Sequence, residues 1–297
     1  MKPCPVCGGE KFAFQFSSGN RHGRHVQKPE ATFSVVACEA CGLMGLADVV
    51  ADESYYQAFY PQGYHEDPSD HGFLARLWSV VARFWLKRKI QAICRFAKPK
   101  AERITLLDVG CGPGHFLSQL DRARFDPHGL EPVGEAVEAA RKRGLDVFQG
   151  NVLVTPLADS TYDVVTLWHV LEHIDRPHVA LARIHAALTS DGLIVITTPN
   201  THSRACRIGK ADWFHLDSPR HLSLFNERNL VQLLAKSGFE PVLRSWLPFD
   251  FPLDLYWSLR RQRWFRLLLF PFYPLLKCFD HENLLVIARK QSATRSV

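Results

Sequence analysis

The sequence contains no long apolar run that is free of charged residues. A membrane-spanning helix needs about 18 consecutive apolar residues, and no stretch of the 297 residues approaches that length. The first residues, Met1 to Cys4, are not followed by the apolar core of a secretory signal peptide. We therefore expect a cytoplasmic protein without a transmembrane segment.

A strong excess of one charge is also missing. The formal net charge of +6 is mild, and the sequence has neither a dense stripe of lysine and arginine nor a recognisable RNA-binding module. Nucleic acid is therefore not an expected partner. The hydrophobic share of 46% and the charged share of 22% are typical of a soluble globular protein, and 297 residues suffice for one large domain with a small appendage.

The glycine fingerprint of dinucleotide-binding proteins, G-x-G-x-x-G, is absent as well. Counted from Gly110, its third glycine position holds His115. Instead, a buried-strand pattern ends at Asp108 and is followed by glycines at every second position, namely Gly110, Gly112 and Gly114. A carboxylate at the tip of this strand would repel a pyrophosphate but would attract an ammonium group. The turn therefore favours a nucleoside that carries an amino acid over a dinucleotide such as NAD.

Four of the eight cysteines form two C-x-x-C-G knuckles, with Cys4 and Cys7 in the first and Cys38 and Cys41 in the second. Each knuckle can present two thiolates from one turn, and four thiolates complete a tetrahedral zinc site. Because no coordination position stays open, we expect the zinc to be structural rather than catalytic. Two unrelated reduced dithiols would not account for the paired spacing.

The stretch Asp108-Val109-Gly110-Cys111-Gly112-Pro113-Gly114 resembles the first motif of the class I S-adenosylmethionine-dependent methyltransferases, which has the form D-x-G-x-G-x-G. The resemblance covers roughly residues 104–246, with a closing strand at 283–290. It implies an α/β fold: a Rossmann-like, doubly wound, seven-stranded sheet whose last strand runs antiparallel, with S-adenosylmethionine as cofactor. A helix is expected to open at Phe116. We expect a zinc-ribbon-like module in 1–45, a linker and amphipathic helix in 46–100, and the methyltransferase domain in 101–297.

Further cofactor-binding residues follow from the strands after the glycine turn. Glu131 ends the second strand, where a carboxylate can accept both ribose hydroxyls. By resemblance, Asn151 stands where the family holds the adenine amino group, and Trp168 ends the fourth strand. The expected cofactor-binding residues are Asp108, Gly110, Cys111, Gly112, Gly114, Glu131, Asn151 and Trp168.

The stretch from His169 to His173 matches H-x-x-E-H, a zinc-protease signature. We reject that reading because the signature requires a long helix, whereas this segment directly follows a strand. His169 and His221 are instead the candidate catalytic bases, since histidine titrates near neutral pH. His221 is the first choice because Arg220 beside it could hold an anionic acceptor. For His173 a structural role is favoured.

Residues 247–282 form an aromatic and basic insertion. Between Leu255 and Phe279 there are eight aromatic residues, five lysines or arginines and no acidic residue. We expect this segment to act as a lid over the acceptor. Its composition also suits peripheral contact with a membrane at the inner face, where Trp, Tyr and Arg prefer to lie.

The expected function is therefore methyl transfer from S-adenosylmethionine to a small acceptor, or to one of lipid-linked or sugar type. Two alternatives stay open: an RNA methyltransferase, and a zinc-ribbon interaction protein with an inactive methyltransferase domain. The presence of Asp108, the three glycines and Glu131 favours an active enzyme.

Overall fold

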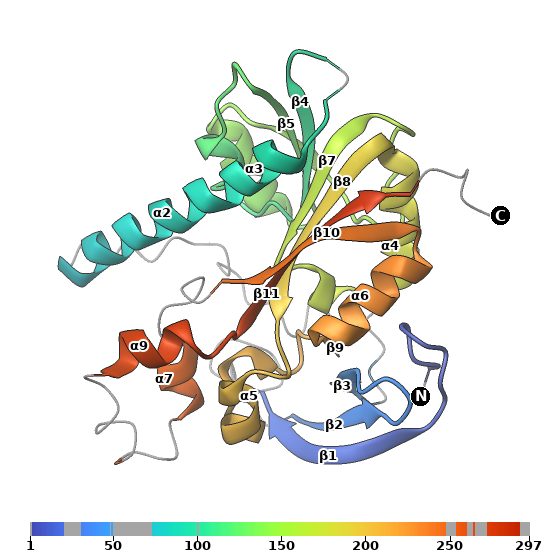
Figure 1. Ribbon diagram of the computed structural model, residues 1–297, viewed down its shortest axis with the longest axis vertical. Coiled ribbons are helices and arrows are strands. Elements are labelled where there is room, and N and C mark those ends of the chain that lie inside the picture. Colours follow the sequence, from blue (N-terminus) through green and yellow to red (C-terminus); the bar gives the residue numbers. More distant parts are fainter. Residues whose placement is uncertain are drawn as a thin grey trace.

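A computed structural model of the chain contains two β-sheets (Figure 1). It describes residues 2–20, 31–47, 49, 73–99, 101–247, 254–259, 264 and 272–291. Most of the predicted linker and much of the predicted insertion therefore lie outside the described residues. No helix in these ranges is long and apolar enough to cross a membrane.

The larger sheet has seven strands in the order β10-β11-β8-β7-β4-β5-β6. Neighbouring strands from β8 to β6 pair in parallel, and β11 runs antiparallel to both β8 and β10. This arrangement confirms the predicted fold class, including the antiparallel last strand. The strands are β4 (Ile104–Val109), β5 (Phe125–Glu131), β6 (Asp146–Gln149), β7 (Tyr162–Trp168), β8 (Leu188–Pro199), β10 (Phe239–Trp246) and β11 (Asn283–Lys290).

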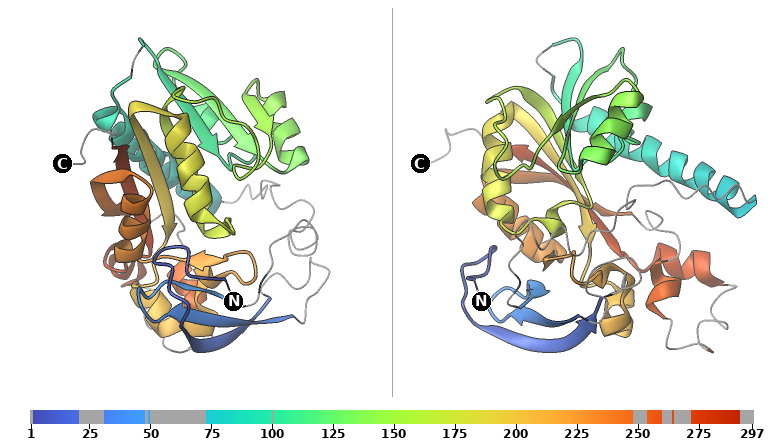
Figure 2. Two further views of the ribbon diagram at one scale, coloured as in Figure 1. Left: turned by 90° about the vertical axis from the view of Figure 1, so that its right-hand side faces the viewer. Right: turned by 180° about the vertical axis from the view of Figure 1, so that it is seen from behind.

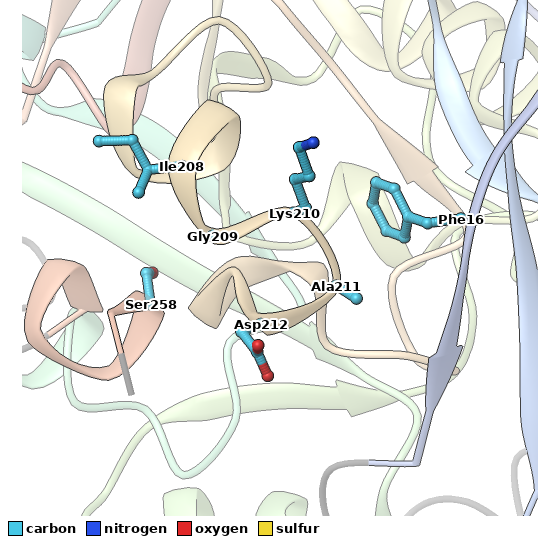
Figure 3. Close-up of a pocket in the computed structure, with 7 residues that line it drawn as sticks. All are labelled: Phe16, Ile208, Gly209, Lys210, Ala211, Asp212 and Ser258. Atoms are coloured by element: carbon cyan, nitrogen blue, oxygen red, sulfur yellow. The ribbon is translucent and has the colours of Figure 1, made fainter. Parts of the chain in front are cut away.

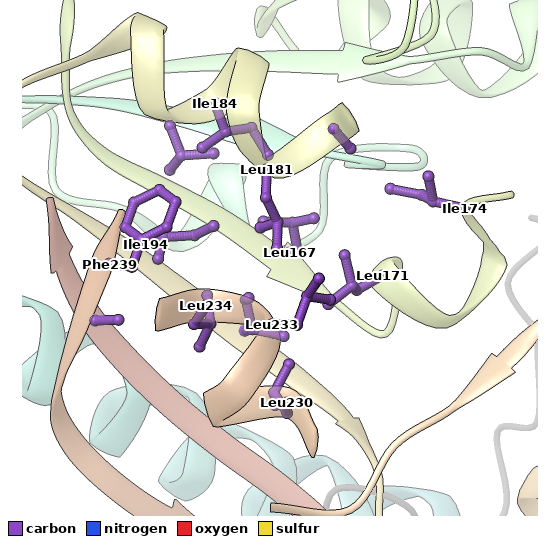
Figure 4. Close-up of a cluster of buried hydrophobic side chains, with 14 of the residues drawn as sticks. Leu167, Leu171, Ile174, Leu181, Ile184, Ile194, Leu230, Leu233, Leu234 and Phe239 are labelled. Carbon is purple, nitrogen blue, oxygen red and sulfur yellow. The ribbon is translucent and has the colours of Figure 1, made fainter. Parts of the chain in front are cut away.

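Helices cover both faces of this sheet (Figure 2). Successive strand residues point to opposite faces, so that Leu107 and Leu106 of β4 belong to different hydrophobic clusters. One cluster packs α4 (Pro177–Ala187) and α6 (Glu227–Lys236) against the sheet (Figure 4). The other contains side chains of α2 (Phe73–Phe96) and α3 (Gly134–Lys142).

The predicted helix at Phe116 is wrong. The segment after the glycine turn forms only a 3-10 turn, η2 (Leu117–Gln119). The physical reason is chain length, because β5 already begins at Phe125 and leaves no room for a longer helix. Leu117 is nevertheless buried and packs in the second hydrophobic cluster of the sheet.

The smaller sheet has the order β1-β2-β3-β9 and lies beside the end of β8 (Figure 1). Three of its strands come from the amino-terminal module: β1 (Phe12–Gly19), β2 (Thr32–Cys38) and β3 (Met44–Leu46). The fourth, β9 (Ser223–Leu224), comes from the long connection after β8. That connection also holds the helix α5 (Arg204–Gly209) and the 3-10 turns η4 (Lys210–Asp212) and η5 (Phe214–Leu216).

The connection between β10 and β11 starts and ends at the carboxyl edge of the parallel strands. Trp246 pairs with Leu284, and Asn283 pairs with Pro199 at the end of β8. Two short helices of this connection are described, α7 (Asp254–Ser258) and α9 (Tyr273–Cys278). A buried lysine of α9, Lys277, forms ion pairs with Asp254 and Glu282 and ties the two helices to β11.

Candidate active site

The glycine turn leaves β4 in a backbone conformation that suits glycine. Gly110 has a φ of 69° and Gly112 a φ of 53°, both in the left-handed region. At Gly110 space is limiting as well, because a Cβ there would lie 2.5 Å from a methyl group of Val170. The turn therefore packs directly against the segment that follows β7.

Asp108 lies at the end of β4, where only 2% of its surface is exposed. Thr166 on the neighbouring strand donates a hydrogen bond to its Oδ1 at 2.6 Å. Burial raises the pKa of the Asp108 carboxyl to about 7, against the opposing effect of the Thr166 hydrogen bond, and the charge of Glu131 raises it further. A cation bound beside this carboxyl group would therefore favour its ionised form.

Glu131 lies at the end of the adjacent strand β5. Its two oxygens accept hydrogen bonds of 2.9 Å from the backbone N–H groups of Gly112 and Val133. These bonds fix the carboxylate beside the glycine turn. Because each carboxylate oxygen has two acceptor positions, capacity remains for hydroxyl groups of a ligand.

Asn151 and Trp168 lie at the ends of the strands on either side of this pair. The side-chain carbonyl of Asn151 accepts a hydrogen bond from Leu153 N at 2.9 Å and keeps one acceptor position. Trp168 packs edge-on against Phe116, and its Nε1 is buried without a hydrogen-bond partner among the described residues. Cys111 is a buried thiol whose pKa is raised by burial, which makes it unreactive.

One residue near this site was not predicted from the sequence. Lys89 of α2 places its Nζ 4.6 Å from the centre of the Trp168 ring, and its charge lowers the pKa of Asp108. In the sequence it is one of several cationic residues on an amphipathic helix. Nothing in the pattern separates it from them.

His169 begins the connection after β7 with a φ of 54°. Its Nδ1 lies 3.3 Å from Oε1 of Glu172, and 16% of its side chain is exposed. The segment then forms the 3-10 turn η3 (Leu171–His173) rather than a long helix, which agrees with the rejection of the protease signature.

His221 lies deeper than His169 and is 6% exposed. Its Nδ1 is 2.7 Å from the carbonyl oxygen of His215, and its ring meets the ring of His173 edge-on at 4.6 Å. Arg220 donates two hydrogen bonds from Nη2 to the carboxylate of Asp217 at 2.6 and 2.7 Å. The guanidinium of Arg220 is therefore paired with Asp217, and an anionic acceptor would have to compete with this ion pair.

The four knuckle cysteines lie together in the amino-terminal module. Their sulfur atoms are within 4.8 Å of one another, and the pairs Cys4–Cys41 and Cys7–Cys38 are each 3.5 Å apart. The backbone N–H of Gly9 points to Cys7 Sγ at 3.3 Å. Four converging thiols with an N–H donor fit a tetrahedral metal ion.

A separate pocket of about 300 Å³ lies between β1 and the segment around η4 (Figure 3). It is lined by Phe16, Ile208, Gly209, Lys210, Ala211, Asp212 and Ser258. None of these residues belongs to the strand ends that carry Asp108 and Glu131. The pocket is therefore not part of the site described above.

Known proteins resemble this chain over the same region. The methyltransferase domain family matches residues 81–244, which is more than half of the chain. A ubiquinone biosynthesis O-methyltransferase of Cereibacter sphaeroides is 29% identical over 168 residues, covering 52% of this chain and 68% of that protein.

Two solved structures share the fold at low sequence identity. An S-adenosylmethionine-dependent methyltransferase from Mesorhizobium loti is 16% identical with a TM-score of 0.50, covering 67% of this chain and 96% of that one. A chain from the complex between the Haloferax volcanii Trm112 methyltransferase activator and a methyltransferase is 19% identical with a TM-score of 0.52, covering 73% and 95%. With the family match, the strand order and the glycine turn after an acidic strand end, this chain belongs to the class I S-adenosylmethionine-dependent methyltransferases.

Proposed function

We propose that the protein transfers the methyl group of S-adenosylmethionine to a hydroxyl oxygen of a small-molecule acceptor. The observation that carries this proposal is the pair of buried carboxylates, Asp108 and Glu131, at the ends of neighbouring strands beside the glycine turn. The name of the Cereibacter sphaeroides relative, an O-methyltransferase of ubiquinone biosynthesis, supports an oxygen acceptor on a small molecule.

On the donor side, Asp108 would accept the ammonium group and Glu131 the ribose hydroxyls. Asn151 would accept the adenine amino group. Lys89 and Trp168 are assigned to the methionine carboxylate, because Lys89 supplies a cation and Trp168 a buried N–H near the end of β7. These roles give the ammonium, hydroxyl and amino groups of the donor an acceptor, and its carboxylate a cation and an N–H donor.

On the acceptor side, we assign the base to His169. A general base needs exposure to the substrate and an orienting partner on its other nitrogen. His169 is the more exposed of the two candidates, and its Nδ1 lies beside Glu172. The base would remove the hydroxyl proton, the oxygen would attack the methyl carbon in line, and the electron pair of the broken carbon–sulfur bond would stay on sulfur.

The finer class of acceptor remains a proposal that rests on the insertion. Trp257, Trp264, Phe272 and Phe279 are between 48% and 80% exposed in a connection that starts at the carboxyl edge of the sheet. Exposed aromatic side chains at this edge suit an acceptor with an apolar portion, such as a lipid-linked molecule.

A structural zinc ion in the cysteine module is part of the same proposal. Burial alone would raise the pKa of Cys38, but backbone hydrogen bonds, from Cys41 first, lower it to about 7. A thiol that ionises readily is a good first ligand. Cys4, Cys7, Cys38 and Cys41 would then hold zinc with no role in the chemical step.

The test is donor binding followed by an acceptor screen. Calorimetry should show that Asp108→Asn weakens S-adenosylmethionine binding at least about tenfold, the range expected when a charged hydrogen bond is lost. The matched control is Asp146→Asn, which removes a carboxylate at the amino-terminal start of β6 that pairs with His128 instead. Labelled donor with phenolic, lipid-linked, sugar and RNA acceptors would then identify the product. Unchanged donor affinity in Asp108→Asn, or labelling of RNA alone, would overturn the proposal.

A further inference from the structure

Two buried side chains, Glu172 and His221, and the half-buried His173 converge on one point. Glu172 and His173 lie on η3, and His221 lies in the loop just before β9. The ligand atoms that these three residues offer lie within 4.8 Å of one another. They come from two separate segments, so their convergence results from the fold and not from sequence proximity alone.

Among the described residues, the carboxylate in this group forms one ion-pair contact, with His169, and no contact with hydrogen-bond geometry. Glu172 is fully buried, and among the described residues neither of its oxygens has a partner with hydrogen-bond geometry. The nearest donor is His169 Nδ1, 3.3 Å from Oε1. An ionised carboxylate in this position is costly without a cation.

Each of the two histidines directs its Nδ1 toward a backbone carbonyl oxygen. His173 Nδ1 is 3.1 Å from the carbonyl oxygen of Arg220, and His221 Nδ1 is 2.7 Å from that of His215. Because a carbonyl oxygen only accepts, each Nδ1 carries the proton, and the lone pair of the neutral ring lies on Nε2. Metal-binding histidines are typically held in this way by the opposite nitrogen.

Asp217, the acidic residue nearest to His221, is already paired with another side chain. Asp217 Oδ2 lies 3.8 Å from His221 Nε2, but its carboxylate is held by Arg220 through short hydrogen bonds. Its charge is therefore already balanced. Among the described residues, no lysine or arginine forms an ion pair with Glu172 that would balance its charge in the same way.

We infer that Glu172, His173 and His221 form a binding site for one divalent transition-metal ion. Two imidazoles and one carboxylate suit zinc, manganese, cobalt or iron better than magnesium or calcium, which prefer oxygen ligands alone. Three protein ligands leave coordination positions open. The site differs from the cysteine cluster in its ligands and its location.

The ion would act on the acceptor, and this step rests on the proposed function. Val170, three residues before His173, packs against Gly110 of the donor turn, so the segment that carries two of the ligands contacts that turn. An acceptor hydroxyl bound at an open position would release its proton more readily. The proton would pass to His169, and the oxygen would form its bond to the methyl carbon as the carbon–sulfur bond breaks. An acceptor with two neighbouring oxygens would fit two open positions.

Manganese binding to the full-length protein tests the site without donor or acceptor. Mn²⁺ is the probe because thiolates select zinc over manganese, and bound Mn²⁺ is detected by its electron paramagnetic resonance signal. The wild-type protein should bind one Mn²⁺ per chain. Glu172→Gln and His221→Asn should each weaken binding at least tenfold, whereas the control His185→Asn, a histidine packed on Phe239, should not change it. Circular dichroism and donor binding check that the variants are folded.

A second measurement needs no variant: electron spin echo envelope modulation detects nitrogen nuclei of ligands that are coupled to the bound Mn²⁺. In the wild-type protein the bound Mn²⁺ should show two imidazole nitrogens. The inference is overturned if no Mn²⁺ binds, if the two variants bind as well as wild type, or if the bound ion shows no imidazole nitrogen. Binding of Mn²⁺ without methylation of any oxygen acceptor would overturn the proposed function and leave the metal site intact.

Discussion

Gly45 of β3 lies opposite Ser223 of β9, and this pair joins the cysteine module to the connection that carries His221. A Cβ at Gly45 would lie 2.7 Å from the carbonyl oxygen of Leu222, so the close approach of the two strands depends on glycine. His221 lies just before this short strand, separated from it by Leu222. The cysteine module is therefore placed to hold the loop that carries His221.

This relationship predicts the effect of removing the proposed structural zinc. Cys38→Ser should lose the metal and loosen the β3–β9 pairing, and methyl transfer should fall with it. Donor affinity should change by about 1 kcal/mol or less, because Asp108 and Glu131 lie on the other sheet. Elemental analysis measures the loss of zinc, calorimetry measures donor affinity, and a turnover assay measures methyl transfer.

The control is Cys94→Ser, which changes a thiol of α2 outside the cluster and should leave one zinc per chain. A metal-free protein that keeps its amino-terminal fold through two disulfides would contradict the zinc assignment. Full activity in a zinc-free Cys38→Ser protein would contradict the link to His221.

Donor binding should depend on pH through Asp108. Its carboxyl has a raised pKa of about 7 in the free protein, and the ammonium group of the donor favours the ionised form. Binding below pH 7 must therefore expel a proton. Affinity should fall about tenfold between pH 8 and pH 6, with proton release visible by calorimetry in buffers of different ionisation enthalpy. A pH-independent affinity, or one that rises toward acid, would contradict the assignment.

Replacing His169 by Gln should lower turnover by about two orders of magnitude or more, the usual contribution of a general base. Donor affinity should stay within about twofold, because the donor contacts lie on other residues. Single-turnover kinetics and calorimetry separate the two effects, with His185→Gln as the control. An equal loss of donor affinity in His169→Gln would assign the residue to the donor pocket.

The sequence predicted the main sheet because each strand carries a local signal. Alternating or continuous apolar residues end at polar groups such as Asp108, Glu131 and Trp168, and parallel strands bring these ends to one edge. The capping box at Asn226, where Asn226 and Asn229 exchange hydrogen bonds, likewise marks the start of α6.

What the sequence could not predict depends on contacts between distant segments. The pairing of β3 with β9 joins two very short strands with no pattern of their own. Lys89 reaches Trp168 only because α2 lies beside the end of β7. Glu172 was passed over as part of a rejected protease motif, and only the fold shows that it is buried beside His173 and His221.

The aromatic insertion is expected to contact anionic membranes. Trp257 and Trp264 are 48% and 80% exposed on the β10–β11 connection, and the chain has a net charge of +6. Exposed tryptophans with nearby cationic residues bind the interface of anionic membranes, and salt weakens the electrostatic part of that binding. The protein should therefore sediment with anionic liposomes at low salt and less so at high salt. The double variant Trp257→Ala, Trp264→Ala should bind them more weakly, whereas Phe148→Ala, an exposed aromatic on β6, should bind as wild type does. If liposomes are ignored, or if the double variant binds them as well as the wild type, the insertion serves only as a cover for the acceptor.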